Sequence, residues 1–125
     1  MIVVTEKIDG NVYHRVTGEC SFSGVIDYVK HNSAEWITIN SLWDFTGSTF
    51  AHDIPNYNLL KVRLIEIKEV VENRVGKKSA FVVYDNGTFA TIRMAITAVE
   101  AIENRFKMCV FRNIAEAIKW LENQI

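Results

Sequence analysis

The feature of the sequence that most constrains its fold is an apolar run at residues 80–84, Ala-Phe-Val-Val-Tyr. A strand with one face in solvent alternates apolar and polar residues, and this run does not alternate. A helical pattern that ends in Gly76 precedes the run, and Asp-Asn-Gly at residues 85–87 closes it. We therefore expect the middle strand of a sheet that is covered on both faces, which indicates an α/β protein.

Strand-like and helical patterns alternate through the rest of the chain. Residues 1–8 and 11–18 are strand-like, and the Asp9-Gly10 step between them suits the positive φ angles of a tight hairpin. Further strands are expected at residues 37–44 and 108–111. Four helices are expected, with the apolar faces Phe22, Val25, Ile26 and Val29; Leu60, Leu64, Ile67 and Val71; Ile92, Ala95, Ile96, Val99 and Ile102; and Ile114, Ala117, Ile118 and Leu121. The predicted order is β-β-α-β-α-β-α-β-α, an N-terminal hairpin followed by parallel strands in one mixed sheet.

Size and charge fit one domain over residues 1–125. A chain of 125 residues with 49% hydrophobic residues can form a single core. Its 14 Lys and Arg residues are balanced by 15 Asp and Glu residues, so no general field attracts the protein to nucleic acid. Arg74, Lys77 and Lys78 form a small basic turn, which could meet an acidic partner and which we expect to lie in solvent. Because no segment resembles a signal peptide or a membrane span, we expect a cytoplasmic protein without membrane insertion.

Ligands of open α/β sheets bind at the carboxyl ends of the strands, which makes three segments candidates for a site. They are residues 44–53, residues 85–93, and Arg112 with Asn113. The longest irregular loop is expected at residues 46–53. The candidate ligand- or partner-binding residues are Asp44, Thr46, Ser48, Thr49, His52, Asp53, Asp85 and Arg93. We expect the three segments to lie along one edge of the sheet.

These candidates give little support to catalysis. The three aspartates could pair as acid and base or hold a divalent ion, but aspartates near turns more often cap helices and close loops. His14, His31 and His52 show no metal-ligand spacing, and the glycines form no phosphate-binding loop. Cys20 and Cys109 belong to no Cys-x-x-Cys motif. We therefore predict no catalytic residue, no metal and no cofactor, and hence a protein that is not an enzyme.

Six short segments carry a resemblance to a known family. They are Val-Thr-Gly-Glu at 16–19, Leu-Trp-Asp-Phe-Thr-Gly at 42–47, Gly-Lys-Lys-Ser-Ala-Phe-Val-Val at 76–83, Arg-Met at 93–94, Val-Phe-Arg at 110–112 and Ala-Ile-Lys-Trp-Leu at 117–121. In their order and spacing, the sequence resembles the SpoIIAA-like family, which is allied to the STAS and SEC14 (CRAL-TRIO) modules. The resemblance covers nearly the whole chain. It implies a mixed sheet with helices mainly on one face and no established enzymatic activity.

The resemblance also bears on a regulatory switch. In anti-anti-sigma factors of this group, a serine at a helix start after the third strand is phosphorylated by a partner kinase. The corresponding residues here are Phe50, Ala51, His52, Asp53, Ile54, Pro55 and Asn56, which include no serine, threonine or glycine. The segment therefore departs from the family's switch motif, and Ser48 and Thr49 are the nearby hydroxyl groups.

Two functions remain open at this stage. The first is a non-catalytic, STAS-like interaction or regulatory module that presents residues 44–56 and the following helix to a protein partner or to another copy of itself, as in a dimer. The alternative is a carrier or sensor of a small apolar, lipid-like ligand. The kinship with SEC14 modules and the many helix-borne Ile, Leu and Val residues motivate this alternative.

Overall fold

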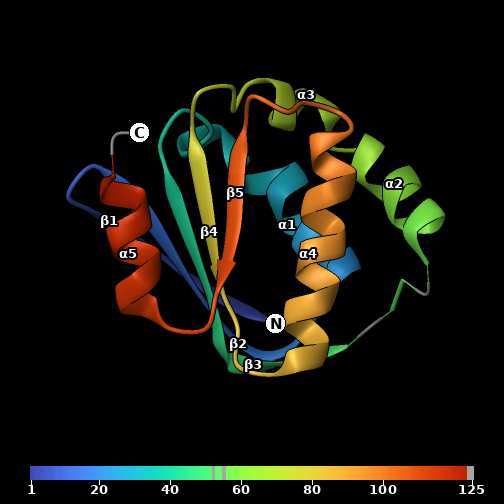
Figure 1. Cartoon of the computed structure of the whole chain (residues 1–125), viewed down its shortest axis with the longest axis horizontal. Helices are drawn as coiled ribbons and strands as arrows, with labels where there is room; N and C mark the ends of the chain where they lie inside the picture. The colour runs from blue at the N-terminus through green and yellow to red at the C-terminus, as the bar shows by residue number, and fades with distance from the viewer. Residues whose placement is uncertain (52, 55, 124–125) are drawn as a thin grey trace.

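The computed structural model describes residues 1–51, 53–54 and 56–123. Its elements follow the predicted order (Figure 1), except that two helices stand where one was predicted. They are β1 (Ile2–Ile8), β2 (Asn11–Ser21), α1 (Phe22–Asn32), the 3-10 turn η1 (Ser33–Glu35), β3 (Ser41–Ala51), α2 (Tyr57–Ile65), α3 (Lys68–Glu72), β4 (Lys78–Val82), α4 (Asn86–Glu100), β5 (Lys107–Phe111) and α5 (Ile114–Glu122). No helix among the described residues is long and apolar enough to cross a lipid bilayer.

The five strands form one mixed sheet in the order β1-β2-β3-β4-β5. β1 pairs with β2 antiparallel, and the other neighbours pair parallel. The hairpin turn is as predicted, because Asp9 and Gly10 have φ angles of 52° and 81°. The middle strand is β3, however, so the prediction that residues 80–84 form the middle is wrong. The first part of the run belongs to β4, which ends at Val82 and pairs in parallel with β3 on one side and β5 on the other.

Helices cover the sheet unequally. α1 to α4 lie on one face and α5 lies on the other, as Figure 1 shows with α5 on the left and α4 on the right. This agrees with the expectation of helices mainly on one face. The larger core gathers side chains such as Trp43, Leu60 and Ile92 under α1 to α4. The smaller core packs Ala80 and Val82 of β4 against α5, so β4 is covered on both faces.

The third strand differs from its prediction at both ends. Ile37 and Ile39 precede the strand, and β3 extends through the predicted irregular loop to Ala51. The reason is non-local, because β2 runs on to Ser21 and pairs in parallel with the second half of β3 after a register shift. There Ser48 and Phe50 are half-buried while their neighbours are exposed, which is the alternation of a strand.

Arg74 is buried, contrary to the expectation of a solvated basic turn. Only 2% of its surface is exposed, and it is the largest fully buried side chain in the described part of the chain. Its two terminal nitrogens donate to neutral oxygens at 2.5–3.3 Å. The acceptors are the carbonyls of Trp36, Ile37, Ile39 and Lys78 and the hydroxyls of Ser41 and Ser79. The side chain therefore joins the end of α3 to the segment before β3 and to the start of β4.

His14 lies in an aromatic cluster on the same face of the sheet. Its ring centroid is 4.1 Å from that of Trp43 and 4.8 Å from that of Trp36, and none of its surface is exposed. Nδ1 lies 2.9 Å from the hydroxyl of Thr5. Burial, with a smaller effect of the charge on Arg74, lowers the pKa of His14 to about 4. The folded protein thus holds this imidazole neutral.

The buried histidine predicts a loss of stability in mild acid. Between the folded pKa of about 4 and the ordinary pKa of 6.5, the unfolded state binds more protons than the folded state. The stability that neutral His14 provides is complete above pH 6.5 and decreases as the pH falls through this window. We expect the free energy of unfolding to decrease by about 2 kcal/mol from pH 7 to pH 5 in urea titrations.

The variants His14→Phe and His31→Gln test whether His14 causes this loss of stability in mild acid. His14→Phe removes the titrating group and retains an aromatic ring, so its stability should change little between these pH values. His31→Gln alters an exposed histidine and should retain the wild-type loss. Equal pH dependence of wild type and His14→Phe would contradict the assignment.

Candidate functional site

Asp44, Thr46, Ser48 and Thr49 lie on β3 rather than in a loop. One carboxylate oxygen of Asp44 accepts hydrogen bonds from the backbone N–H of Thr46 at 2.9 Å and from its hydroxyl at 2.6 Å. The hydroxyl of Ser48 donates to the carbonyl of Phe45 at 2.8 Å. These bonds lie where the register of β2 and β3 shifts, so they satisfy backbone groups at the irregularity. Thr49 is exposed on the strand.

The other two candidate aspartates cap helices. Asp53 accepts from the backbone N–H groups of Phe22 at 3.0 Å and Ser23 at 3.3 Å, at the start of α1. Partial burial raises the pKa of Asp53, but the hydrogen bonds from Ser23 and Phe22 outweigh burial and hold this pKa below its usual range. Asp85 accepts from the N–H of Thr88 at 2.8 Å and is the N-cap of α4. Both residues stabilise helix starts.

The carboxyl ends of β4 and β5 lie side by side, as predicted for parallel strands, but the candidates do not form one cluster because they lie on both faces of the sheet. Asp44 follows Leu42 on the side of α5, whereas Asp53 binds α1 on the opposite side of the sheet. Arg93 is exposed on α4, and His52 lies outside the described residues. Among residues 1–51, 53–54 and 56–123, no group of three or more His, Cys, Asp or Glu side chains could hold a metal ion. The arrangement favours structural roles for these side chains.

The two cysteines are free thiols with little nucleophilic character. Burial raises the pKa of Cys20 to about 11, so its thiol remains protonated at neutral pH. Burial also raises the pKa of Cys109, which lies on β5. A thiolate nucleophile has no support at either position.

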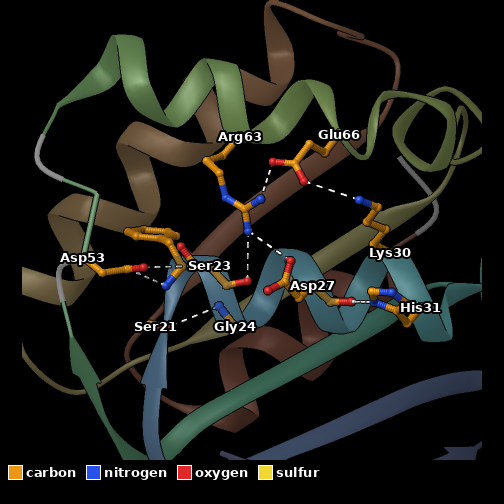
Figure 2. Close-up of polar contacts among 10 residues, drawn as sticks. Ser21, Ser23, Gly24, Asp27, Lys30, His31, Asp53, Arg63 and Glu66 are labelled. Atoms are coloured by element: carbon orange, nitrogen blue, oxygen red, sulfur yellow. Dashed lines mark hydrogen bonds and ion pairs between the residues drawn. The ribbon is translucent and has the colours of Figure 1, made fainter.

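An ion-pair network that the sequence did not reveal joins α1 to α2 (Figure 2). Arg63 on α2 donates to the carboxylate of Asp27 on α1 at 3.1 Å and to the carbonyl of Ser23 at 3.3 Å. Its other terminal nitrogen binds Glu66, which also contacts Lys30 of α1 at 3.5 Å. Hydrogen bonds to Asp27 and Glu66 raise the pKa of Arg63. The network fixes α2 beside α1, and Arg63 and Glu66 on the inner edge of α2 are both ion-paired.

The outward side of α2 is apolar. Leu59, Val62 and Ile65, which we call the α2 stripe, are 48%, 63% and 59% exposed. They are spaced three residues apart, so they lie along one side of the helix. The predicted inward residues Leu60 and Leu64 are buried, as expected. α2 is therefore apolar on two sides, and within the described part of the chain only the inner side is packed against other elements.

A cavity of about 120 Å³ lies between the sheet and the helices of the larger core. α1, α3 and α4 contribute aliphatic walls, and the aromatic rings of Trp36, Trp43 and Phe106 lie around it. Arg74 and Ser79 are the polar residues of the lining. The fold thus leaves a measurable space inside its main core.

Comparisons with known proteins bear on the fold. No protein-family profile matches the sequence, and no curated protein is significantly similar to it. A crystal structure of an uncharacterised protein of the DUF3478 family from Shewanella loihica PV-4, described as having a SpoIIAA-like fold, superposes with a TM-score of 0.54. The alignment covers 96% of this chain and 92% of that chain. The chain has the SpoIIAA-like fold.

That similarity concerns the fold alone, because the two sequences are 14% identical over the aligned region. It confirms the fold class expected from the short segments of the sequence. Residues 50–56, which the family resemblance aligned with the switch segment, run from the last residues of β3, which ends at Ala51, to the residue before α2, which begins at Tyr57. In this chain Asn56 caps α2 by accepting from the N–H of Leu59 at 3.0 Å.

The α1–α2 network predicts a stabilising role for Arg63. The side chains of Arg63 and Glu66 are partly buried, at 27% and 33% exposed, and three oxygen-bearing partners surround the guanidinium. Replacing Arg63 with Met should lower the free energy of unfolding by about 1 kcal/mol, less in high salt, because networks exceed isolated surface pairs. Chemical denaturation at two salt concentrations measures both effects.

Lys68→Met is the matched control. Lys68 pairs with Glu72 at 3.6 Å one turn along α3, and both side chains are well exposed. Its replacement should change the stability by less than about 0.5 kcal/mol. Equal effects of the two substitutions would show that the network does not join α1 to α2 energetically.

Proposed function

We propose that this protein is a non-catalytic interaction or regulatory module that binds a protein partner through the α2 stripe. The observation that carries the proposal is the exposure of Leu59, Val62 and Ile65 on one side of a helix whose other side is packed. Exposed apolar side chains that lie together mark interaction surfaces more often than isolated ones do. The stripe belongs to the helix that follows residues 44–56, the segment that sequence analysis selected for partner binding.

The arrangement around the stripe suits docking. The Arg63 network holds α2 against α1, so the stripe is presented on a helix that is already ordered. A rigid surface loses little conformational entropy when a partner binds. Lys61 lies over the ring of Tyr57 at 5.6 Å on the same helix and supplies a positive charge beside the apolar side chains. A partner with an apolar helix and an acidic residue at its edge would match both features.

A second copy of the chain also meets the apolar requirement. If two α2 helices meet antiparallel about a two-fold axis near Val62, Leu59 of each copy lies opposite Ile65 of the other. Such an isologous contact needs no further segment. Self-association is therefore the first form of the proposal to test.

The proposal includes that the protein is not an enzyme. Its support is that Asp44, Asp53 and Asp85 each accept hydrogen bonds that stabilise the fold, and that the thiol of Cys20 is held protonated. A lipid-like ligand has weaker support. Pockets for drug-sized ligands measure roughly 300–1,000 Å³. The cavity under α1 to α4 is about 120 Å³.

Val62→Glu tests the proposed surface. Val62 is 63% exposed, so a carboxylate there should leave folding intact and place an unpaired charge in the interface. We expect sedimentation equilibrium and capture on immobilised protein to show binding by the wild type, to itself or to a specific partner. The substitution should weaken that binding at least about tenfold, which corresponds to 1.4 kcal/mol.

Val75→Glu is the control, since Val75 is an exposed valine outside the stripe. It should bind as the wild type does. The proposal is wrong if folded Val62→Glu binds as tightly as the wild type, or if the wild type stays monomeric at high concentration and captures no partner that depends on Val62.

A further inference from the structure

Arg74 places a full positive charge in the wall of the cavity under α1 to α4. Among the described residues, it is the one Lys, Arg, Asp or Glu side chain that is fully buried. The oxygens that its terminal nitrogens contact belong to carbonyls and hydroxyls, not to a carboxylate. The rings of Phe106 and Trp36 lie 5.0 and 5.9 Å from the guanidinium carbon. Among residues 1–51, 53–54 and 56–123, its charge is therefore solvated by dipoles and aromatic faces rather than by a counter-ion.

One donor of this guanidinium is unused. The Nε atom of Arg74 is buried and has no hydrogen-bond partner in the described structure. A buried N–H without an acceptor costs free energy, so a natural protein that retains one commonly reserves it for water, an ion or a ligand. The side chain that carries Nε also lines the cavity. A hydrogen-bond acceptor inside the cavity would find this donor available.

The rest of the cavity lining limits the size and polarity of a ligand that carries this acceptor. Most of the walls are aliphatic or aromatic side chains, contributed by the sheet and by α1, α3 and α4. The volume of about 120 Å³ is close to that of an engineered apolar cavity of about 150 Å³ that binds benzene. A single six-membered ring fits this scale, whereas an acyl chain does not. The occupant must then be small, largely apolar and equipped with one acceptor.

We propose that the cavity binds a molecule the size of one aromatic ring that carries a hydrogen-bond acceptor, and that this acceptor takes the N–H of Arg74 Nε. The site is independent of the α2 stripe, which faces outward from the helix layer. The acceptor is either a neutral oxygen, as in phenols, or a carboxylate, as in small aromatic acids. Both share the same contact with Arg74 and differ in charge.

The test uses three probes of similar size with the purified full chain: phenol, benzoate and toluene. Phenol and toluene differ in the hydroxyl group, so their comparison isolates the acceptor. The Nε–Hε resonance of Arg74 in ¹H–¹⁵N NMR spectra reports directly on the proposed bond. We expect phenol or benzoate to bind saturably, to shift this resonance and to bind about tenfold more tightly than toluene, the gain typical of one hydrogen bond. Binding of phenol alone would identify a neutral ligand class, and tighter binding of benzoate would identify acids.

A cavity-filling variant locates the binding. Ala95 lines the cavity from α4, so Ala95→Leu should fill part of it and reduce the affinity for phenol or benzoate at least about tenfold. Ala101→Leu makes the same change at an exposed position at the end of α4 and should bind as the wild type does. The inference is overturned if none of the probes binds the wild type, if toluene binds as tightly as phenol and benzoate, or if the Arg74 resonance does not move on saturation. It is also overturned if folded Ala95→Leu binds as the wild type does. The wild-type measurements decide the matter even where a variant does not fold.

Discussion

The rest of the structure depends on the burial of one guanidinium. The segment between α1 and β3 has little regular structure, so several of its carbonyls have no strand or helix partner. Arg74 donates hydrogen bonds to these carbonyls. By donating to these carbonyls and to the hydroxyls of Ser41 and Ser79, it joins the starts of β3 and β4. Those hydroxyls also bond to each other at 2.6 Å. A buried charge is stable here because its terminal donors are satisfied by dipoles.

The same side chain links the core to its two unusual features. It forms part of the cavity wall, and its charge contributes to the low pKa of His14 in the neighbouring aromatic cluster. The polar side of the core is therefore concentrated around Arg74, while the cavity is apolar elsewhere. On the outside, the Arg63 network fixes α2 so that the α2 stripe faces away from the core. An inner site and an outer surface can thus exist on one small domain without sharing residues.

Local patterns were sufficient for most elements and insufficient for contacts between them. The turn at Asp9 and Gly10 and most of the inward faces of the helices follow from short-range spacing, although Ile114 of the predicted α5 face is exposed. The second half of β3 does not, because its small polar residues become a strand only by pairing with an extended β2. Strand order is non-local in the same way, which is why the apolar run was placed in the middle of the sheet.

The candidate site shows a similar division. Sequence reasoning weighted the aspartates towards capping, and the structure places Asp53 and Asp85 at helix starts. It assigned Arg74 to solvent because a basic residue after a helix usually lies there, and burial of that residue depends on carbonyls more than thirty positions earlier in the chain. The α2 stripe was visible as a three-residue spacing of Leu59, Val62 and Ile65, but only the packing of α2 shows that this side is uncovered.

The central claim is that Arg74 organises the starts of β3 and β4, and the unfolding free energy of Arg74→Met tests it most directly. Methionine replaces the unbranched aliphatic part of the side chain and removes every donor, which leaves buried carbonyls unsatisfied. Compared in urea with the wild type and with Arg105→Met, which alters an exposed arginine paired with Glu103, the variant should lose about 4 kcal/mol. The control should unfold at nearly the same urea concentration as the wild type. A loss for Arg74→Met within about 1 kcal/mol of the control would contradict the account, because buried acceptors could not then depend on this side chain.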